Sequence, residues 1–192
     1  EELSSHRLGQ ILENRGVNGV ILGPDCRGRG HLRLKWENHC CVRIGAYFVW
    51  PPVHQVSSHQ AQCSQLAVRQ ALKLGYRKLG LAIRKSDHEA ANRAWSAGFL
   101  AEVESLPKKH RVPLFIESDW TRERFLSWFH THKPEVILSF HMKILKWLED
   151  EGLNVPSDVG FIDLDLKDSK GDRAGIYENH KEIGATAVDI LT

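Results

Sequence analysis

Polar side chains that can bind a ligand stand at the ends of two predicted strands in the second half of the chain. Residues 135–140 form a short apolar run with β-branched side chains, and His141 follows it directly. Residues 159–164 form a second such run, which contains Asp163 and leads into Asp165. In open sheets of parallel strands, ligands bind beyond the carboxyl ends of the strands. Asp165 and His141 are therefore candidate binding residues.

Both candidates also have a purely structural interpretation, and neither indicates catalysis. Asp165 can cap the turn that follows its strand, and a lone histidine such as His141 is often a satisfied structural group. Asp163 and Asp165 share one face of a strand, as a catalytic carboxylate pair requires. No activated nucleophile, metal-ligand set or phosphate-binding loop accompanies them, so the sequence predicts a protein that is not an enzyme.

Metal and nucleotide sites are not predicted either. The chain has 11 histidines and a His-Cys-Cys run at 39–41, but no C-x-x-C or H-x-x-x-H pair. The segment Gly28-x-Gly30 lacks the third glycine and the helix that present backbone N–H groups to a pyrophosphate. We therefore expect no metal and no cofactor.

Composition indicates an ordinary globular chain. Its 192 residues carry 26 basic and 24 acidic side chains, which are interspersed, so no nucleic-acid-binding tail is visible. The four cysteines are too few and too irregularly spaced for a disulfide framework, which favours reduced thiols and a cytoplasmic location. No run reaches transmembrane length, and no signal peptide is seen, so no membrane association is expected.

Helical and strand patterns alternate along the whole chain. Helical spacing of apolar residues with suitable stop signals predicts helices at 3–16, 59–74, 86–106, 121–132, 144–151 and 179–192. Ser86-x-x-Glu89 and Asn179-x-x-Glu182 have the spacing of capping boxes at two of these helices. Short apolar runs predict strands at 17–22, 40–46, 56–57, 78–83, 112–116, 135–140 and 159–164, with an extended segment at 173–177. Such alternation predicts an α/β fold with parallel sheets.

In order and spacing, these motifs resemble the effector-binding region of LacI-type transcription regulators, which has a periplasmic-binding-protein-like fold. The most specific matching segment is GLNVPSDVGFIDLD at 152–165. Other matching segments are RGVNGVILGP at 15–24, LAVRQALKLGYRKLGLAI at 66–83, WSAGF at 95–99, KPEVILS at 133–139 and AGIYENHKEIGATAVDIL at 174–191.

The resemblance implies two similar subdomains, each with a parallel sheet flanked by helices, and an effector in the cleft between them. The first subdomain would comprise residues 1–76 and 175–192 and lack its first strand-helix-strand, and the second would comprise 77–174. The fold would thus be incomplete at both ends, and the DNA-binding headpiece would be absent from this chain. The implied partners are a small-molecule effector, operator DNA through that headpiece, and a second copy in a homodimer.

Carried over to this sequence, the resemblance implies an effector site that includes a carboxylate and an indole. A carboxylate can accept two hydrogen bonds from sugar hydroxyls, and an indole face can stack on the apolar face of a sugar ring. A tryptophan at 95, where the family more often has arginine, implies a less acidic ligand. The implied effector-binding residues are Asp165, Trp120, Trp95, His141, His59 and Glu178.

Three functions remain open at this stage. The first is the ligand-sensing domain of a transcription regulator or repressor that binds a carbohydrate. A transport-associated sugar-binding protein of the same fold is the second, and an enzyme on a similar α/β scaffold is the third. Trp120 can also be a core aromatic, and His59 can cap its helix.

Overall fold

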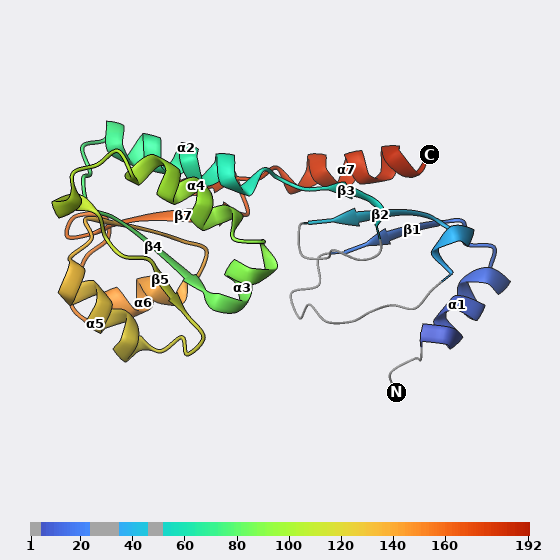
Figure 1. Cartoon of the computed structure of the whole chain (residues 1–192), viewed down its shortest axis with the longest axis horizontal. Helices are drawn as coiled ribbons and strands as arrows, with labels where there is room; N and C mark the ends of the chain where they lie inside the picture. The colour runs from blue at the N-terminus through green and yellow to red at the C-terminus, as the bar shows by residue number, and fades with distance from the viewer. Residues whose placement is uncertain (1–4, 24–34, 46–51) are drawn as a thin grey trace. The chain divides into compact units, whose positions relative to one another are not determined.

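The computed structural model describes residues 5–23, 35–45 and 52–192 (Figure 1). It divides into two compact units, unit 1 (Glu1–Ser58 and Asn179–Thr192) and unit 2 (His59–Glu178). Gly28 and Gly30, whose motif was expected to bind no nucleotide, lie outside the described residues. Among those described, no helix combines the length and the apolar character needed to cross a membrane.

Unit 1 contains a sheet of three parallel strands in the order β1-β2-β3. The strands are β1 (Gly19–Leu22), β2 (Cys40–Ile44) and β3 (His54–Val56). Helix α7 (His180–Leu191) packs against all of them. The unit also contains α1 (Ser5–Asn14) and a 3-10 turn, η1 (Trp36–Asn38).

Unit 2 contains a sheet of five parallel strands in the order β5-β4-β6-β7-β8. Its strands are β4 (Leu79–Arg84), β5 (Phe115–Glu117), β6 (Val136–Ser139), β7 (Gly160–Leu166) and β8 (Gly175–Tyr177). Its helices are α2 (Gln60–Lys73), α3 (Lys85–Ala90), α4 (Ala94–Val103), α5 (Arg122–His132) and α6 (Lys143–Asp150), with a 3-10 turn, η2 (Lys108–His110). The predicted α/β class, with parallel strands and flanking helices in both parts, is confirmed.

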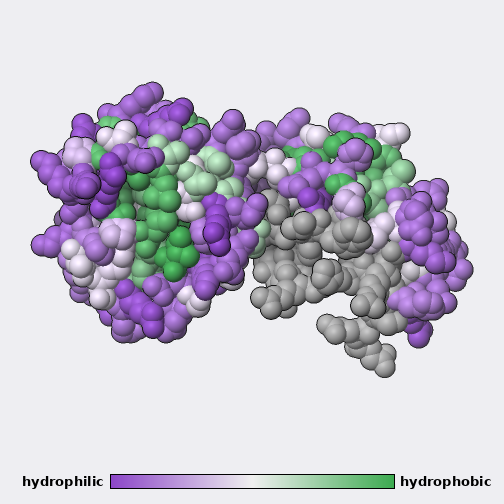
Figure 2. Space-filling view, in the orientation of Figure 1, coloured by the Kyte–Doolittle hydropathy of each residue, from purple (hydrophilic) through white to green (hydrophobic). Residues whose placement is uncertain are grey.

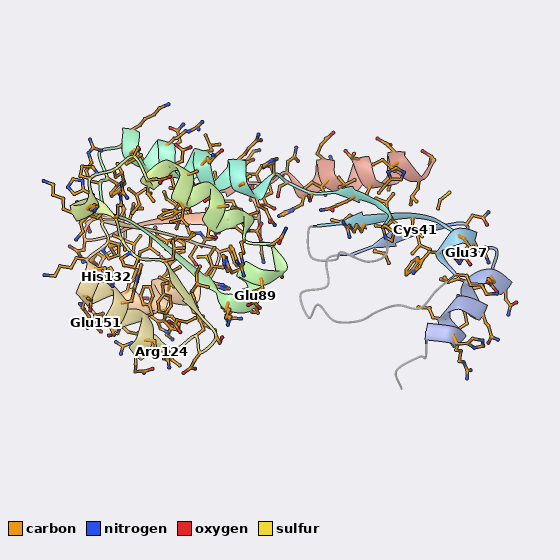
Figure 3. The ribbon with its side chains drawn as sticks, viewed as in Figure 1. Glu37, Cys41, Glu89, Arg124, His132 and Glu151 are labelled. Atoms are coloured by element: carbon orange, nitrogen blue, oxygen red, sulfur yellow. The ribbon has the colours of Figure 1, made fainter. Side chains whose placement is uncertain are left out.

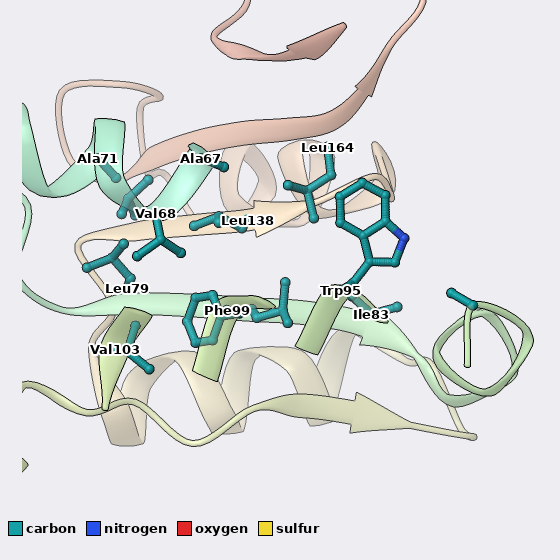
Figure 4. Close-up of a cluster of buried hydrophobic side chains, with 13 residues drawn as sticks. Ala67, Val68, Ala71, Leu79, Ile83, Trp95, Phe99, Val103, Leu138 and Leu164 are labelled. Atoms are coloured by element: carbon teal, nitrogen blue, oxygen red, sulfur yellow. The ribbon is translucent and has the colours of Figure 1, made fainter. Parts of the chain in front are cut away.

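Helices cover both faces of the five-stranded sheet, because its strands are apolar on both sides. In β4, Leu79, Leu81 and Ile83 face α2 and α4, in a core that also contains Trp95 and Phe99 (Figure 4). We call this the α2–α4 core. Ala82 faces the opposite side, in a core formed mainly with α5 and α6, which we call the α5–α6 core. Figure 1 shows the two helical layers on either side of the sheet.

Close backbone contact joins the two helices of the first layer. A Cβ atom added at Gly98 of α4 would overlap the carbonyl oxygen of Ala61 in α2, and it would lie 2.8 Å from the Ala61 carbonyl carbon. Any side chain at position 98 would therefore push the helices apart. Only glycine fits this approach, which explains its place in the WSAGF segment.

The predicted helix over 86–106 is wrong in its continuity and in its cap. The structure has two helices, α3 and α4, separated by Asn92 and Arg93, whose φ angles are 46° and 63°. Ser86 lies inside α3, which begins after Arg84 without a side-chain cap. Two consecutive residues in the left-handed region end one helix and redirect the chain into the next.

The boundary between the units differs from the expected one. The resemblance implies a crossing after residue 76, which would leave the helix over 59–74 in the first subdomain. In the structure α2 belongs to unit 2, where Ala67, Val68 and Ala71 pack in the α2–α4 core. Gly75, with a φ of 100°, makes an ordinary turn from α2 toward β4 within that unit. At the other end, unit 2 extends to Glu178, whereas residue 174 was expected.

Candidate functional site

Strand register aligns several polar residues along the carboxyl edge of the five-stranded sheet. Arg84 of β4 pairs with Glu117 of β5, and Ser139 of β6 pairs with Asp163 of β7. His141 follows the end of β6 by two residues, and Asp165 lies near the end of the adjacent strand β7. The predicted strand ends therefore meet at one edge, as parallel strands require.

Several of these polar side chains lie on the same face of the sheet as the α5–α6 core, nearer the carboxyl ends of the strands. Ala82, two residues before Arg84, lies in that core, as does Phe161, two residues before Asp163. Because side chains in a strand alternate between faces, Arg84 and Asp163 continue the same face beyond the core. The edge thus presents a polar row directly above an apolar layer.

Two buried side chains shape the ends of β6 and β7. The Ser139 hydroxyl donates to the carbonyl oxygen of Ala82 at 2.7 Å and accepts from the His141 N–H at 3.0 Å. The Asp163 carboxylate is 4% exposed and accepts from the Asp165 N–H at 3.0 Å. Asp163 therefore performs the structural capping that was the alternative reading for Asp165.

His141 contacts both charged and aromatic neighbours. Its Nε2 atom lies 3.1 Å from Oδ2 of Asp87 in α3 and 3.3 Å from the backbone N of Arg84. The imidazole centroid is 4.7 Å from Trp120 and 4.6 Å from Phe140. The ring is thus held on two sides by aromatic groups and on a third by α3, the helix that carries Glu89 in Figure 3.

Trp120 lies against the aromatic layer beneath this edge. Its ring centroid is 5.0 Å from that of Phe115 and 6.3 Å from that of Trp147. The indole Nε1 is buried, and no described residue accepts its hydrogen bond. Since a buried N–H without an acceptor is costly, a ligand or a water molecule that reached this group would relieve the cost.

The structure places the other predicted residues in three different surroundings. Trp95 is 3% exposed and packs in the α2–α4 core, with its ring 6.1 Å from Phe140. His59 is the N-cap of α2 and accepts a hydrogen bond from the Gln62 N–H at 3.2 Å. Asp165 and Glu178 are partly buried, and their carboxylates approach within 4.8 Å of each other. Contact of any of these residues with a ligand stays a prediction.

Sequence reasoning missed two residues of the edge, Arg84 and Asp87. Arg84 directly follows the predicted strand 78–83, so the same strand-end rule could have found it. Asp87 carried no signal, because the sequence predicts it on the exposed first turn of a long helix. The break after α3 places it beside His141 instead.

His88, which follows Asp87 in α3, has a lowered pKa. Burial is the main cause that lowers the pKa of His88, and the nearby Arg93 lowers it further. Neutral imidazole is therefore favoured there at physiological pH.

The histidine and cysteine run of unit 1 provides thiols but no disulfide. Cys40, Cys41 and Cys63 are free cysteines. Burial raises the pKa of the Cys41 thiol, with a contribution from adjacent Cys40. Both effects favour the protonated thiol, which is a poor nucleophile and a poor metal ligand.

Comparison with known proteins shows similarity in structure. No family model matches the sequence, and no curated protein matches it. A LacI family regulator from Weissella paramesenteroides with bound glucose is 14% identical, with a TM-score of 0.73 over 97% of this chain and 75% of that one. One from Enterococcus faecium with bound ribose is 17% identical, with a TM-score of 0.73 over 99% of this chain and 75% of that one.

A third solved structure agrees with these two. The transcription regulator from Lactobacillus plantarum is 16% identical, with a TM-score of 0.72 over 97% of this chain and 75% of that chain. At such identities the likeness is one of fold. The chain has the fold of LacI-type transcription regulators, as its motifs predict.

Proposed function

We propose that this chain is the ligand-sensing part of a LacI-type transcription regulator and that its ligand is a sugar or a sugar derivative. The observation that carries the proposal is a shared fold over 97% or more of the chain with regulators whose structures contain glucose and ribose. In this reading the protein binds its ligand without converting it. The structural neighbours support that choice, because they are described as regulators.

We place the ligand at the carboxyl edge of the five-stranded sheet, where Asp165, His141 and Trp120 lie. A carboxylate accepts hydrogen bonds from paired hydroxyl groups, and the adjacent aromatic layer matches the apolar face of a sugar ring. His59, Glu178 and Trp95 complete the proposed set of effector-binding residues. Enclosure of the ligand between two subdomains stays a prediction.

The regulatory output follows from population shift. A ligand that binds one conformation more tightly than another moves the equilibrium between them, whereas equal affinity for both moves nothing. We propose that the full-length protein is a cytoplasmic homodimer that contacts operator DNA through a separate headpiece. A two-fold dimer matches a palindromic operator.

Thermal stabilisation by a panel of neutral sugars tests the proposal. A ligand present at 100 times its Kd adds about 2.7 kcal/mol to the free energy of unfolding. For a chain of this length, such a gain raises the Tm by about 5–10 °C. Absence of any shift across pentoses, hexoses and their disaccharides would count against a sugar sensor.

A pair of variants tests the site. Asp165→Asn keeps the size of the side chain but removes its charge, so we expect most of the ligand-induced Tm shift to disappear. Asp168→Asn is the matched control, because Asp168 is exposed and accepts a hydrogen bond from the Lys170 N–H within its own loop. An equal shift in both variants would show that Asp165 does not contact the ligand.

A further inference from the structure

The ring nitrogen Nε2 of His141 faces two groups that make opposite demands on it. The Arg84 N–H, at 3.3 Å, is a donor and needs an unprotonated nitrogen. The Asp87 carboxylate, at 3.1 Å, is an acceptor and needs an N–H. A single nitrogen of a neutral imidazole can satisfy only one of these partners.

Interaction strength decides between the two. A hydrogen bond to a carboxylate is roughly twice as strong as one between neutral groups. An unprotonated Nε2 would also place its lone pair against a carboxylate oxygen, in a site where the histidine side chain is only 12% exposed and the aspartate side chain 26%. The carboxylate therefore favours the proton on Nε2.

The other ring nitrogen, Nδ1, is then left as an acceptor. Among the described residues it has no hydrogen-bonding partner, and it is not among the atoms closed off from solvent. Nδ1 therefore calls for a hydrogen-bond donor on the ligand.

We propose that Asp87 is a positioning residue that holds His141 as the Nε2–H tautomer and so presents Nδ1 to a hydroxyl of the ligand. The proposal rests on the proposed function for the identity of the ligand. It specifies a neutral polyhydroxyl compound, since an anionic group at this position would meet an acceptor nitrogen on a ring that already lies beside the Asp87 carboxylate. Sugar phosphates and sugar acids are disfavoured by the same contacts.

The tautomer can be read in the ligand-free protein by long-range ¹H–¹⁵N correlation NMR of the imidazole rings. The chain has 11 histidines, so the His141 signals are assigned from their loss in His141→Asn. We expect the Nε2–H pattern in the native protein and a change toward Nδ1–H in Asp87→Asn, whose carboxamide can donate to Nε2. A native Nδ1–H pattern, or an unchanged pattern in Asp87→Asn, overturns the proposal.

His130 provides the internal control. Its Nε2 lies 3.2 Å from Oε1 of Glu151, which Figure 3 labels, but its side chain is 56% exposed. His130 belongs to α5, on the face of the sheet opposite the α2–α4 core. Its NMR pattern must stay the same in Asp87→Asn. A simultaneous change at His130 would mean that the variant disturbs the fold. The His141 pattern is then measured in a second variant, Asp87→Ser.

Ligand preference gives a separate test. Calorimetry with glucose and ribose, and with glucose 6-phosphate and glucuronate, should show binding of a neutral sugar and about tenfold weaker binding in Asp87→Asn. Tighter binding of an anionic sugar overturns the proposed ligand class. If none of the four compounds binds, the result contradicts the proposed sugar-sensing function. The NMR pattern of His141 still decides the role of Asp87.

Discussion

Substitution of Gly98 by alanine tests the closest contact in unit 2. In an open helix this change would stabilise the protein by about 1 kcal/mol, because alanine has the better helix propensity. Here the new Cβ would overlap the Ala61 carbonyl oxygen and lie 2.8 Å and 2.9 Å from the Ala61 carbonyl carbon and Cα. Backbone atoms cannot move aside by changing rotamer, so α4 must shift away from α2.

The size of the effect follows from these opposing contributions. Overpacking costs about 1–3 kcal/mol, and a backbone overlap belongs at the upper end of that range. After the gain in propensity, we expect a net loss of about 2 kcal/mol in the free energy of unfolding. This corresponds to a Tm lower by about 4–8 °C for a chain of this length.

Urea unfolding followed by circular dichroism measures the change. Ala97→Gly is the matched control, because Ala97 is the exposed neighbour in the same helix and reports propensity alone, with a loss of about 1 kcal/mol. The reasoning is refuted if Gly98→Ala raises the free energy of unfolding by as much as Ala97→Gly lowers it. Such a result would mean that the two helices do not approach as closely as described.

Two further changes test the supports of the sheet. Trp128→Phe removes the hydrogen bond from Nε1 to the Pro113 carbonyl oxygen, 2.8 Å long, and should cost about 1–2 kcal/mol in urea unfolding, more than the control Trp147→Phe. Glu135 accepts from the Arg77 N–H at 2.6 Å and the Lys78 N–H at 3.1 Å, and the first of these bonds is the main cause that lowers its pKa below 4.5. A carboxylate whose pKa is lower in the folded state stabilises the protein at a pH above its unfolded-state pKa. This stabilisation is lost as the pH falls through the folded-state pKa. The stability difference between native protein and Glu135→Gln should therefore be larger at pH 7 than at pH 3, and a difference independent of pH would contradict this role.

Much of the fold was predictable because it depends on short-range pattern. The apolar runs at 135–140 and 159–164 became β6 and β7, since a strand covered on both faces has no polar alternation. The break at Asn92 and Arg93 was not predictable in this way. Neither residue is glycine or proline, and although asparagine adopts the left-handed conformation fairly often, arginine seldom does.

The candidate site was predictable only where it depends on strand ends. His141 and Asp165 follow from that rule, since His141 comes just after the end of β6 and Asp165 lies near the end of the adjacent strand β7. Asp87 depends on where α3 ends, and Trp95 depends on which side of α4 faces the core. Both depend on tertiary packing, so residue spacing could not predict the contact of Asp87 with His141 or the burial of the Trp95 indole.

Unit 2 also has apolar residues at its surface. Figure 2 shows apolar residues gathered on the visible face of that unit, bordered by polar ones. The polar row of the carboxyl edge lies beyond the α5–α6 core, so hydrogen bonding at the edge and packing beneath it involve different side chains. Variants of Asp87 and Asp165, which are partly exposed, can therefore be made without opening the core.

The aromatic layer beneath the edge also gives the protein an optical signal of its own. Of the six tryptophans in the chain, Trp95, Trp120, Trp128 and Trp147 belong to unit 2, and Trp120 touches both His141 and Trp147. Indole emission responds to polarity and to nearby imidazole, so a ligand that contacts this edge will change the fluorescence of Trp120 first. Occupancy of the edge can thus be followed in the native protein without any attached dye.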